Sequence, residues 1–172
     1  KKLINYNIKI SNYSTILFNF FLIIFAELIF NFWLQNKISF DREIFYILII
    51  SSLIRNYGTT MVNFLYAKNK HIKFNSILLI LSLIFIPIAY LLSNKYGMLG
   101  LAYTYLIYEI IFLLTGFKEI YANFQNIYNA KSFLFELIKI IFFIMCILLN
   151  NFYLFLFILL LFFYDIKQFY EK

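Results

Sequence analysis

The chain has 172 residues, of which 64% are hydrophobic and only 13% are charged, and its formal net charge is +7. Soluble domains carry roughly 25% charged residues, so this composition disfavours a soluble enzyme or binding domain. The apolar residues stand in long runs, which indicates an all-α, polytopic membrane protein with one transmembrane helical domain over residues 1–172. In that class Lys and Arg in short loops explain the positive charge, and we expect no nucleic-acid partner.

Six segments are expected to cross the bilayer as helices. At about 1.5 Å of rise per residue, a helix of about 20 residues crosses roughly 30 Å of hydrocarbon. The expected spans are residues 15–34, 44–66, 74–93, 98–117, 133–149 and 151–169. In the last region we expect a turn at Asn150 and Asn151, and one long tilted helix is the alternative.

The third and fourth spans are joined by a very short polar break at residues 93–100. Gly97 and Gly100 lie in this break, and glycine permits both a tight turn and a close approach of two helices. We therefore expect a transmembrane hairpin here, with Pro87 as a tolerated bend or a kink in its first helix.

The basic residues are distributed unevenly over the polar segments at 1–14, 35–43, 67–73, 93–100, 117–132 and 165–172. Eleven of them, counting Lys139 just inside the fifth span, fall on the side of the two termini. Three fall on the other side, namely Lys37, Arg42 and Lys95. Because Lys and Arg accumulate in cytoplasmic loops, we expect both ends of this segment to be cytoplasmic.

The second expected span contains a polar stripe. Ser51, Arg55, Thr59 and Asn63 follow one another at intervals of four residues, so they lie on one face of a helix. Such a face is too polar to meet lipid and must look into protein or water. These four residues are our candidates for a substrate cavity.

Three ionisable residues lie deep in the expected spans, namely Glu27, Arg55 and Glu109. A charge there costs several kcal/mol, so it usually faces a cavity or a partner. In one interpretation Arg55 attracts an anionic substrate and the two carboxylates bind a proton or a cation. In the other, Arg55 forms a structural ion pair with either Glu27 or Glu109, and the sequence leaves both interpretations open.

No enzyme signature is recognisable in the sequence. It has no Ser/His/Asp or Cys/His set, no glycine-rich phosphate loop and no metal-ligand cluster, so we expect neither catalysis nor a cofactor. The chain begins at Lys1 without a recognisable signal peptide, and we expect it to be a fragment of a longer protein.

Two motifs resemble a known family. A basic loop, Tyr66-Ala67-Lys68-Asn69-Lys70, follows the second span, and Tyr96-Gly97-Met98-Leu99-Gly100-Leu101-Ala102-Tyr103-Thr104 opens the fourth. Their order and spacing resemble the C-terminal portion of polysaccharide (O-antigen or capsule) flippases of the Wzx type, in the multidrug/oligosaccharidyl-lipid/polysaccharide exporter superfamily. The resemblance covers about residues 15–121.

The resemblance implies a bundle of two lobes around a cavity, of which this chain is one lobe. It implies flipping of undecaprenyl-pyrophosphate-linked oligosaccharide across the bacterial inner membrane for surface polysaccharide synthesis. The partners would be the bilayer, the lipid-linked oligosaccharide, and either the missing N-terminal lobe or a second chain.

Two alternatives to a flippase follow from the same residues. A cation-coupled small-molecule exporter of the same superfamily would use Glu27 and Glu109 as titrating carboxylates. A non-transporting scaffold subunit of a glycan-assembly complex would bury the polar stripe against other helices, and Arg55 would then matter only for folding.

Overall fold

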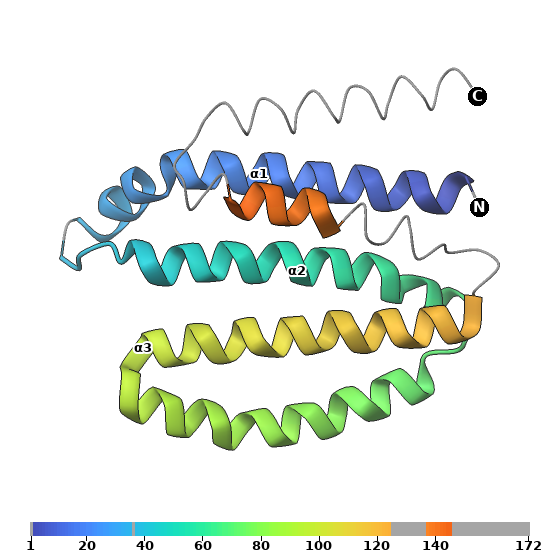
Figure 1. Cartoon of the computed structure of the whole chain (residues 1–172). Coiled ribbons are helices and arrows are strands. Elements are labelled where there is room, and N and C mark those ends of the chain that lie inside the picture. Colours follow the sequence, from blue (N-terminus) through green and yellow to red (C-terminus); the bar gives the residue numbers. More distant parts are fainter. Residues whose placement is uncertain (1, 36, 125–136, 146–172) are drawn as a thin grey trace. The chain divides into compact units, whose positions relative to one another are not determined.

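The computed structural model describes residues 2–35, 37–124 and 137–145, with side chains from residue 9 onward. The described residues are helical apart from short connections, which confirms the all-α prediction for them. Three helices, α1 (Lys2–Leu34), α2 (Arg42–Ala67) and α3 (Ile72–Phe124), belong to a first compact unit at Lys1–Ile127 (Figure 1). A helix at residues 137–145 belongs to the second unit, Tyr128–Lys172.

Local sequence signals fix the ends of α2. The side chain of Asp41 caps its N-terminus and accepts hydrogen bonds from the backbone N–H groups of Glu43 and Ile44, at 3.0 and 3.1 Å. These bonds satisfy donors that the first helical turn leaves free. The connection from α2 to α3 passes through Asn69, whose φ of 54° is the left-handed conformation that Asn tolerates.

A sharp turn divides α3 into a first arm, residues 72–96, and a second arm, residues 98–124. The turn occurs at Gly97, whose φ of 62° and ψ of −141° are accessible essentially to glycine alone (Figure 1). A side chain at Gly100 would collide with the backbone carbonyl of Leu92 on the opposite arm. The two glycines thus serve the turn and the close approach that the sequence predicts for this hairpin.

At the other end of the hairpin the arms are joined by an ion pair. Lys73 Nζ, at the beginning of the first arm, lies 2.8 Å from Glu119 Oε1 on the second arm. The Glu119 side chain is buried and Lys73 is mostly exposed. The hairpin is therefore held at both ends, by glycine packing at one and by this pair at the other.

α2 lies between α1 and the second arm of α3 (Figure 1). On the side facing α3, Gly58 of α2 packs against Phe112, and Val62 packs against Gly116. The two glycines let the helices approach closely. Toward α1, α2 presents a hydrogen-bonded ladder. Its side-chain bonds are Ser52 to Asn19 at 3.2 Å, Asn56 to Ser11 at 3.2–3.3 Å, and Thr60 to Ser11 at 3.0 Å.

The outer surfaces of α1 and α3 are strongly apolar. Among the described residues, two helical stretches are long and apolar enough to cross a membrane, Lys9–Leu34 within α1 and Ile72–Phe124. The most apolar window of the second stretch contains no buried residue. On α1 the exposed large apolar side chains are Ile10, Leu17, Phe18, Phe21, Ile24, Phe25, Leu28, Ile29, Phe32 and Trp33. Apolar surface of this extent is unusual on a soluble monomer and suits a lipid environment.

The expected spans compare with the helices as follows. Residues 15–34, 44–66, 74–93 and 98–117 each lie within a helix. The fifth span, 133–149, is described only at 137–145, where it is helical, and the sixth, 151–169, lies outside the described residues. Two polar segments expected as connections are helical where the structure describes them: α1 begins at Lys2, and α3 continues into the expected connector as far as Phe124.

Candidate functional site

The centre of the site is an ion pair between α2 and α3. Arg55 Nη1 donates to Glu109 Oε1 at 3.0 Å. The Glu109 side chain is completely buried, whereas 45% of the Arg55 side chain is exposed. The carboxylate is thus enclosed between the helices, and its cationic partner reaches the surface of the unit. Of the two partners that the sequence left open for Arg55, the structure places Glu109 beside it.

Phe112 completes the environment of the guanidinium. Arg55 Cζ lies 4.6 Å from the centroid of the Phe112 ring, which is within the range of a cation–π interaction. The same ring packs against Gly58, where a Cβ atom would come within 2.8 Å of it. Gly58 lies three residues after Arg55, so the tight α2–α3 contact and the ion pair occupy the same helical turn.

The predicted polar stripe divides into a buried and an exposed part. Ser51 is fully buried, and its hydroxyl donates to the backbone oxygen of Ile47 at 2.8 Å. Arg55, Thr59 and Asn63 are exposed and together form what we call the open strip of α2. Eight residues of helix separate its ends, so the strip is about 12 Å long.

Glu27 does not join this cluster. Its Oε2 accepts hydrogen bonds from Arg42 at the first residue of α2, at 2.6 Å from Nη2 and 3.2 Å from Nε. The hydrogen bond and the charge of Glu27 raise the pKa of the Arg42 guanidinium above its usual value. Glu27 therefore does not pair with Arg55 in this structure. It lies near the connection from α1 to α2, where Arg42 is its partner.

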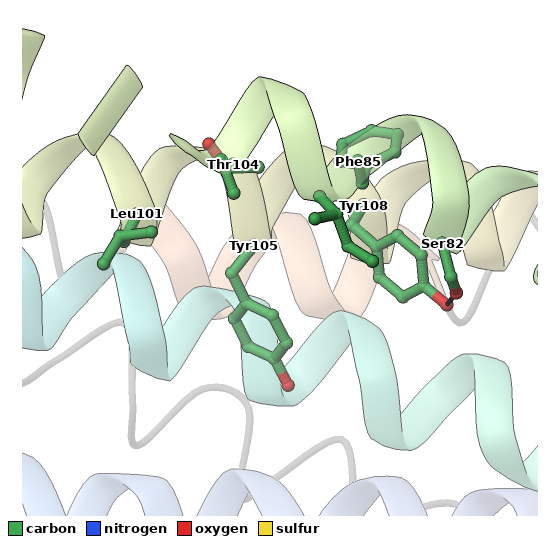
Figure 2. A pocket seen from close by; sticks show the side chains of 8 residues that line it. Ser82, Phe85, Leu101, Thr104, Tyr105 and Tyr108 are labelled. Carbon is green, nitrogen blue, oxygen red and sulfur yellow. Dashed lines mark hydrogen bonds between the residues drawn. The ribbon is translucent and has the colours of Figure 1, made fainter. Parts of the chain in front are cut away.

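A pocket of about 340 Å³ lies between the two arms of α3, within the size range of small-molecule sites. Figure 2 shows Ser82, Phe85 and Tyr108 grouped at one end, and Ser82 Oγ lies 3.4 Å from the Tyr108 hydroxyl oxygen. The Phe85 and Tyr108 rings meet edge to face, with centroids 5.4 Å apart. The lining residues are Ser82, Phe85, Ile86, Ala89, Leu101, Thr104, Tyr105 and Tyr108.

Sequence reasoning anticipated one part of this arrangement and missed another. Tyr103, Tyr105 and Tyr108 with Thr104 could be interpreted from the sequence as the lining of a sugar path, although packing was the preferred interpretation, and Thr104, Tyr105 and Tyr108 do line the pocket. The ladder of Ser52, Asn56 and Thr60 was missed, although these residues follow at the same four-residue interval, one position after the stripe. The sequence signal that could have revealed the ladder was a second set of polar residues at four-residue spacing, offset by one position from the first.

The exposed side chains of the site are of a kind that suits an anion. Within the described part of the chain no three His, Cys, Asp or Glu side chains come together. The exposed guanidinium of Arg55 and the neighbouring Thr59 and Asn63 offer hydrogen-bond donors on a unit whose outer helices are apolar. No protein-family model, no curated protein and no solved structure matches this chain.

Proposed function

We propose that the chain is a lobe of a transporter that flips oligosaccharides linked to undecaprenyl pyrophosphate across the bacterial inner membrane. The chain would be a multi-pass membrane protein with both ends of this segment in the cytoplasm. A second lobe, from a longer protein or a second chain, would close the cavity. The lipid-linked units would supply the synthesis of a surface polysaccharide.

The half-exposed Arg55 carries this proposal. It is eleven residues from either end of the expected span 44–66, which is about 16 Å of helix. Arg side chains near helix ends can extend to the headgroups, but this depth is too great for that. A guanidinium that is 45% exposed at such a depth needs water or an anion as its surroundings.

The geometry of the pair leaves capacity for a second anion. A guanidinium carries five N–H donors, and Glu109 is bonded through Nη1. Arg binds phosphate through two parallel hydrogen bonds, so a diphosphate is well suited to the donors that remain. Glu109 would hold the cation in place while the diphosphate approaches from the open strip.

The resemblance of residues 66–70 and 96–104 to Wzx-type flippases supports the same proposal. The turn at Gly97 and the close approach at Gly100 are what that motif requires of the chain. The open strip supports a second lobe, because Thr59 and Asn63 would otherwise meet lipid.

One observation favours a cation-coupled exporter as the second candidate. Glu109 Oε2 is buried and makes no hydrogen bond with the described residues, so this carboxylate has an oxygen available for a proton or cation. The scaffold alternative would require helices of a partner to cover Thr59 and Asn63, which are exposed in this chain.

Complementation of a bacterium that lacks its own glycan flippase tests the proposal. The complete gene would be compared with Arg55→Ala and with the exchanged pair Arg55→Glu/Glu109→Arg at matched membrane levels. Arg42→Ala is the matched control, because Arg42 also pairs with a glutamate but lies outside the open strip.

A flippase restores surface glycan, and both changes at Arg55 abolish the restoration while Arg42→Ala retains it. The exchanged pair is the informative variant, because it keeps an ion pair but moves the cation to the buried position. If the exchanged pair restores glycan as well as the wild type does, Arg55 acts only in folding. If the wild type restores none, the flippase proposal is contradicted.

A further inference from the structure

The lining of the pocket between the arms of α3 is mostly apolar. Phe85, Ile86, Ala89 and Leu101 contribute only apolar side-chain atoms. Of the lining residues with hydroxyl groups, Ser82 and Tyr108 are directed toward each other (Figure 2). Thr104 donates to the backbone oxygen of Gly100 at 2.8 Å, which leaves the Tyr105 hydroxyl as the remaining polar group. A sugar needs several unpaired hydrogen-bonding groups in its site, because buried polar atoms without partners are costly. The pocket therefore suits a hydrocarbon rather than a glycan.

The pocket opens onto the apolar exterior of α3. Ile86 lines it and is 65% exposed, and Leu101 and Tyr105 line it while remaining more than a third exposed. Ala89 provides room in the wall because its side chain is a single methyl group. A flexible hydrocarbon chain can enter an opening that is lined in this way.

The pocket and the open strip face the same side of the unit. α2 and the second arm of α3 run parallel, because the first arm reverses the chain between them. Successive helical residues turn by about 100°. Thr59 lies one residue after Gly58, which faces α3, and Tyr108 lies one residue before Glu109, which faces α2. Gly58 and Glu109 both face the contact between the two helices. In parallel neighbouring helices, the residue after one contact residue and the residue before the other project to the same side, so Thr59 and Tyr108 do so.

The pocket also lies next to the ion pair along the second arm. Tyr105 lines the pocket and precedes Glu109 by four residues, which is about 6 Å of helix. Glu109 in turn holds Arg55 at 3.0 Å. A molecule with a phosphate at Arg55 and a hydrocarbon tail can reach both places on one face.

We infer that the pocket between the arms of α3 binds the polyprenyl chain of the lipid whose diphosphate binds Arg55. This inference rests on the proposed function and adds a second subsite to it. The first isoprene units would pass Tyr105 and lie against Phe85, Ile86 and Leu101. The substrate would then be selected by its chain as well as by its headgroup.

Photo-cross-linking tests the inference on the complete chain in nanodiscs. The probe is a polyprenyl diphosphate with a diazirine in its chain, and the comparison probe is phosphatidylglycerol with a diazirine in an acyl chain. Mass spectrometry locates the labelled residues, and excess unlabelled polyprenyl diphosphate measures competition. Ala89→Trp fills the pocket, and Ile80→Trp is the matched control on the exposed opposite face of the same arm.

We expect competed labelling at residues that line the pocket. Ala89→Trp should reduce it by about tenfold or more, because two or more methylene groups lose their place, while Ile80→Trp should not. Competed labelling of the wild type away from the pocket, or labelling unchanged by Ala89→Trp, would refute the subsite and leave the flippase proposal intact.

Two further outcomes separate the alternatives. Equal labelling of the pocket by the phosphatidylglycerol probe would identify the occupant as ordinary membrane lipid and overturn the inference. The absence of any competed labelling in the wild type would contradict the proposed function itself, and the inference with it. The mapping in the wild type decides the matter even if Ala89→Trp fails to fold.

Discussion

Replacing Arg55 by alanine should destabilise the protein strongly, and the structure gives the reason. Glu109 is completely buried and is bonded to Arg55 at 3.0 Å, so Arg55→Ala leaves a buried carboxylate without its cation. Removing one member of a buried pair costs about 3–5 kcal/mol, and we expect a loss toward the lower end of this range because 45% of the Arg55 side chain is exposed. Loss of the cation–π contact with Phe112 at 4.6 Å adds roughly 0.5–1 kcal/mol.

The double variant Arg55→Met/Glu109→Leu tests whether the loss in Arg55→Ala comes from the unpaired Glu109 carboxylate. Because apolar residues of similar volume often replace a buried ion pair without loss, we expect its free energy of unfolding to return to within about 1 kcal/mol of the wild type. The assay is reversible unfolding in mixed micelles with increasing sodium dodecyl sulfate, followed by circular dichroism. If the free energy of unfolding of Arg55→Ala is within about 0.5 kcal/mol of the wild-type value, the burial of Glu109 does not depend on Arg55 and the reasoning is refuted.

Three further predictions concern other contacts and use the same unfolding assay. Gly100→Ala should destabilise by about 1–3 kcal/mol, because its Cβ would meet the carbonyl of Leu92, whereas Met98→Ala, an exposed position beside it, should be neutral. Asn56→Leu should cost about 0.6–1.7 kcal/mol by removing hydrogen bonds to α1, and a stability equal to the wild type would contradict the ladder. Arg42→Ala should leave the unfolding midpoint unchanged, because its pair is exposed, and a large loss would show a structural role for it.

The hairpin of α3 could be predicted from the sequence because its signals are local. Two apolar stretches of spanning length flank a short break, and the break contains Gly97 and Gly100. The positive φ at Gly97 and the contact of Gly100 with Leu92 are requirements that glycine alone meets. A pattern of this kind needs no knowledge of neighbouring helices.

The ends of the helices could not be predicted in the same way. Hydropathy marks the part of a helix that is apolar, whereas backbone hydrogen bonds continue through polar residues as well. Residues 2–14 and 118–124 are polar enough to be assigned outside the expected spans, yet they continue α1 and α3. The predicted spans therefore locate the apolar part of each helix but not the residues at which the helix begins and ends.

The partner of Arg55 was also beyond the sequence. Glu27 and Glu109 have equal standing on a single sequence, because depth along a span is all that can be counted. The choice depends on which helix α2 packs against at that level, and Gly58 against Phe112 decides it in favour of α3. Gly58 in the middle of a polar run was the one hint of a close helix contact.

Water at the open strip is the central claim, and thiol labelling in intact cells tests it most directly. Thr59→Cys and Ile80→Cys would be made in a background without native cysteines, in which the one cysteine of this sequence is changed by Cys146→Ser. We expect a membrane-impermeant methanethiosulfonate reagent to label Thr59→Cys, because a thiolate forms only in water, and not Ile80→Cys on the apolar exterior. Labelling of neither position, with both proteins in the membrane, would show that the strip does not face an aqueous cavity and would contradict the account.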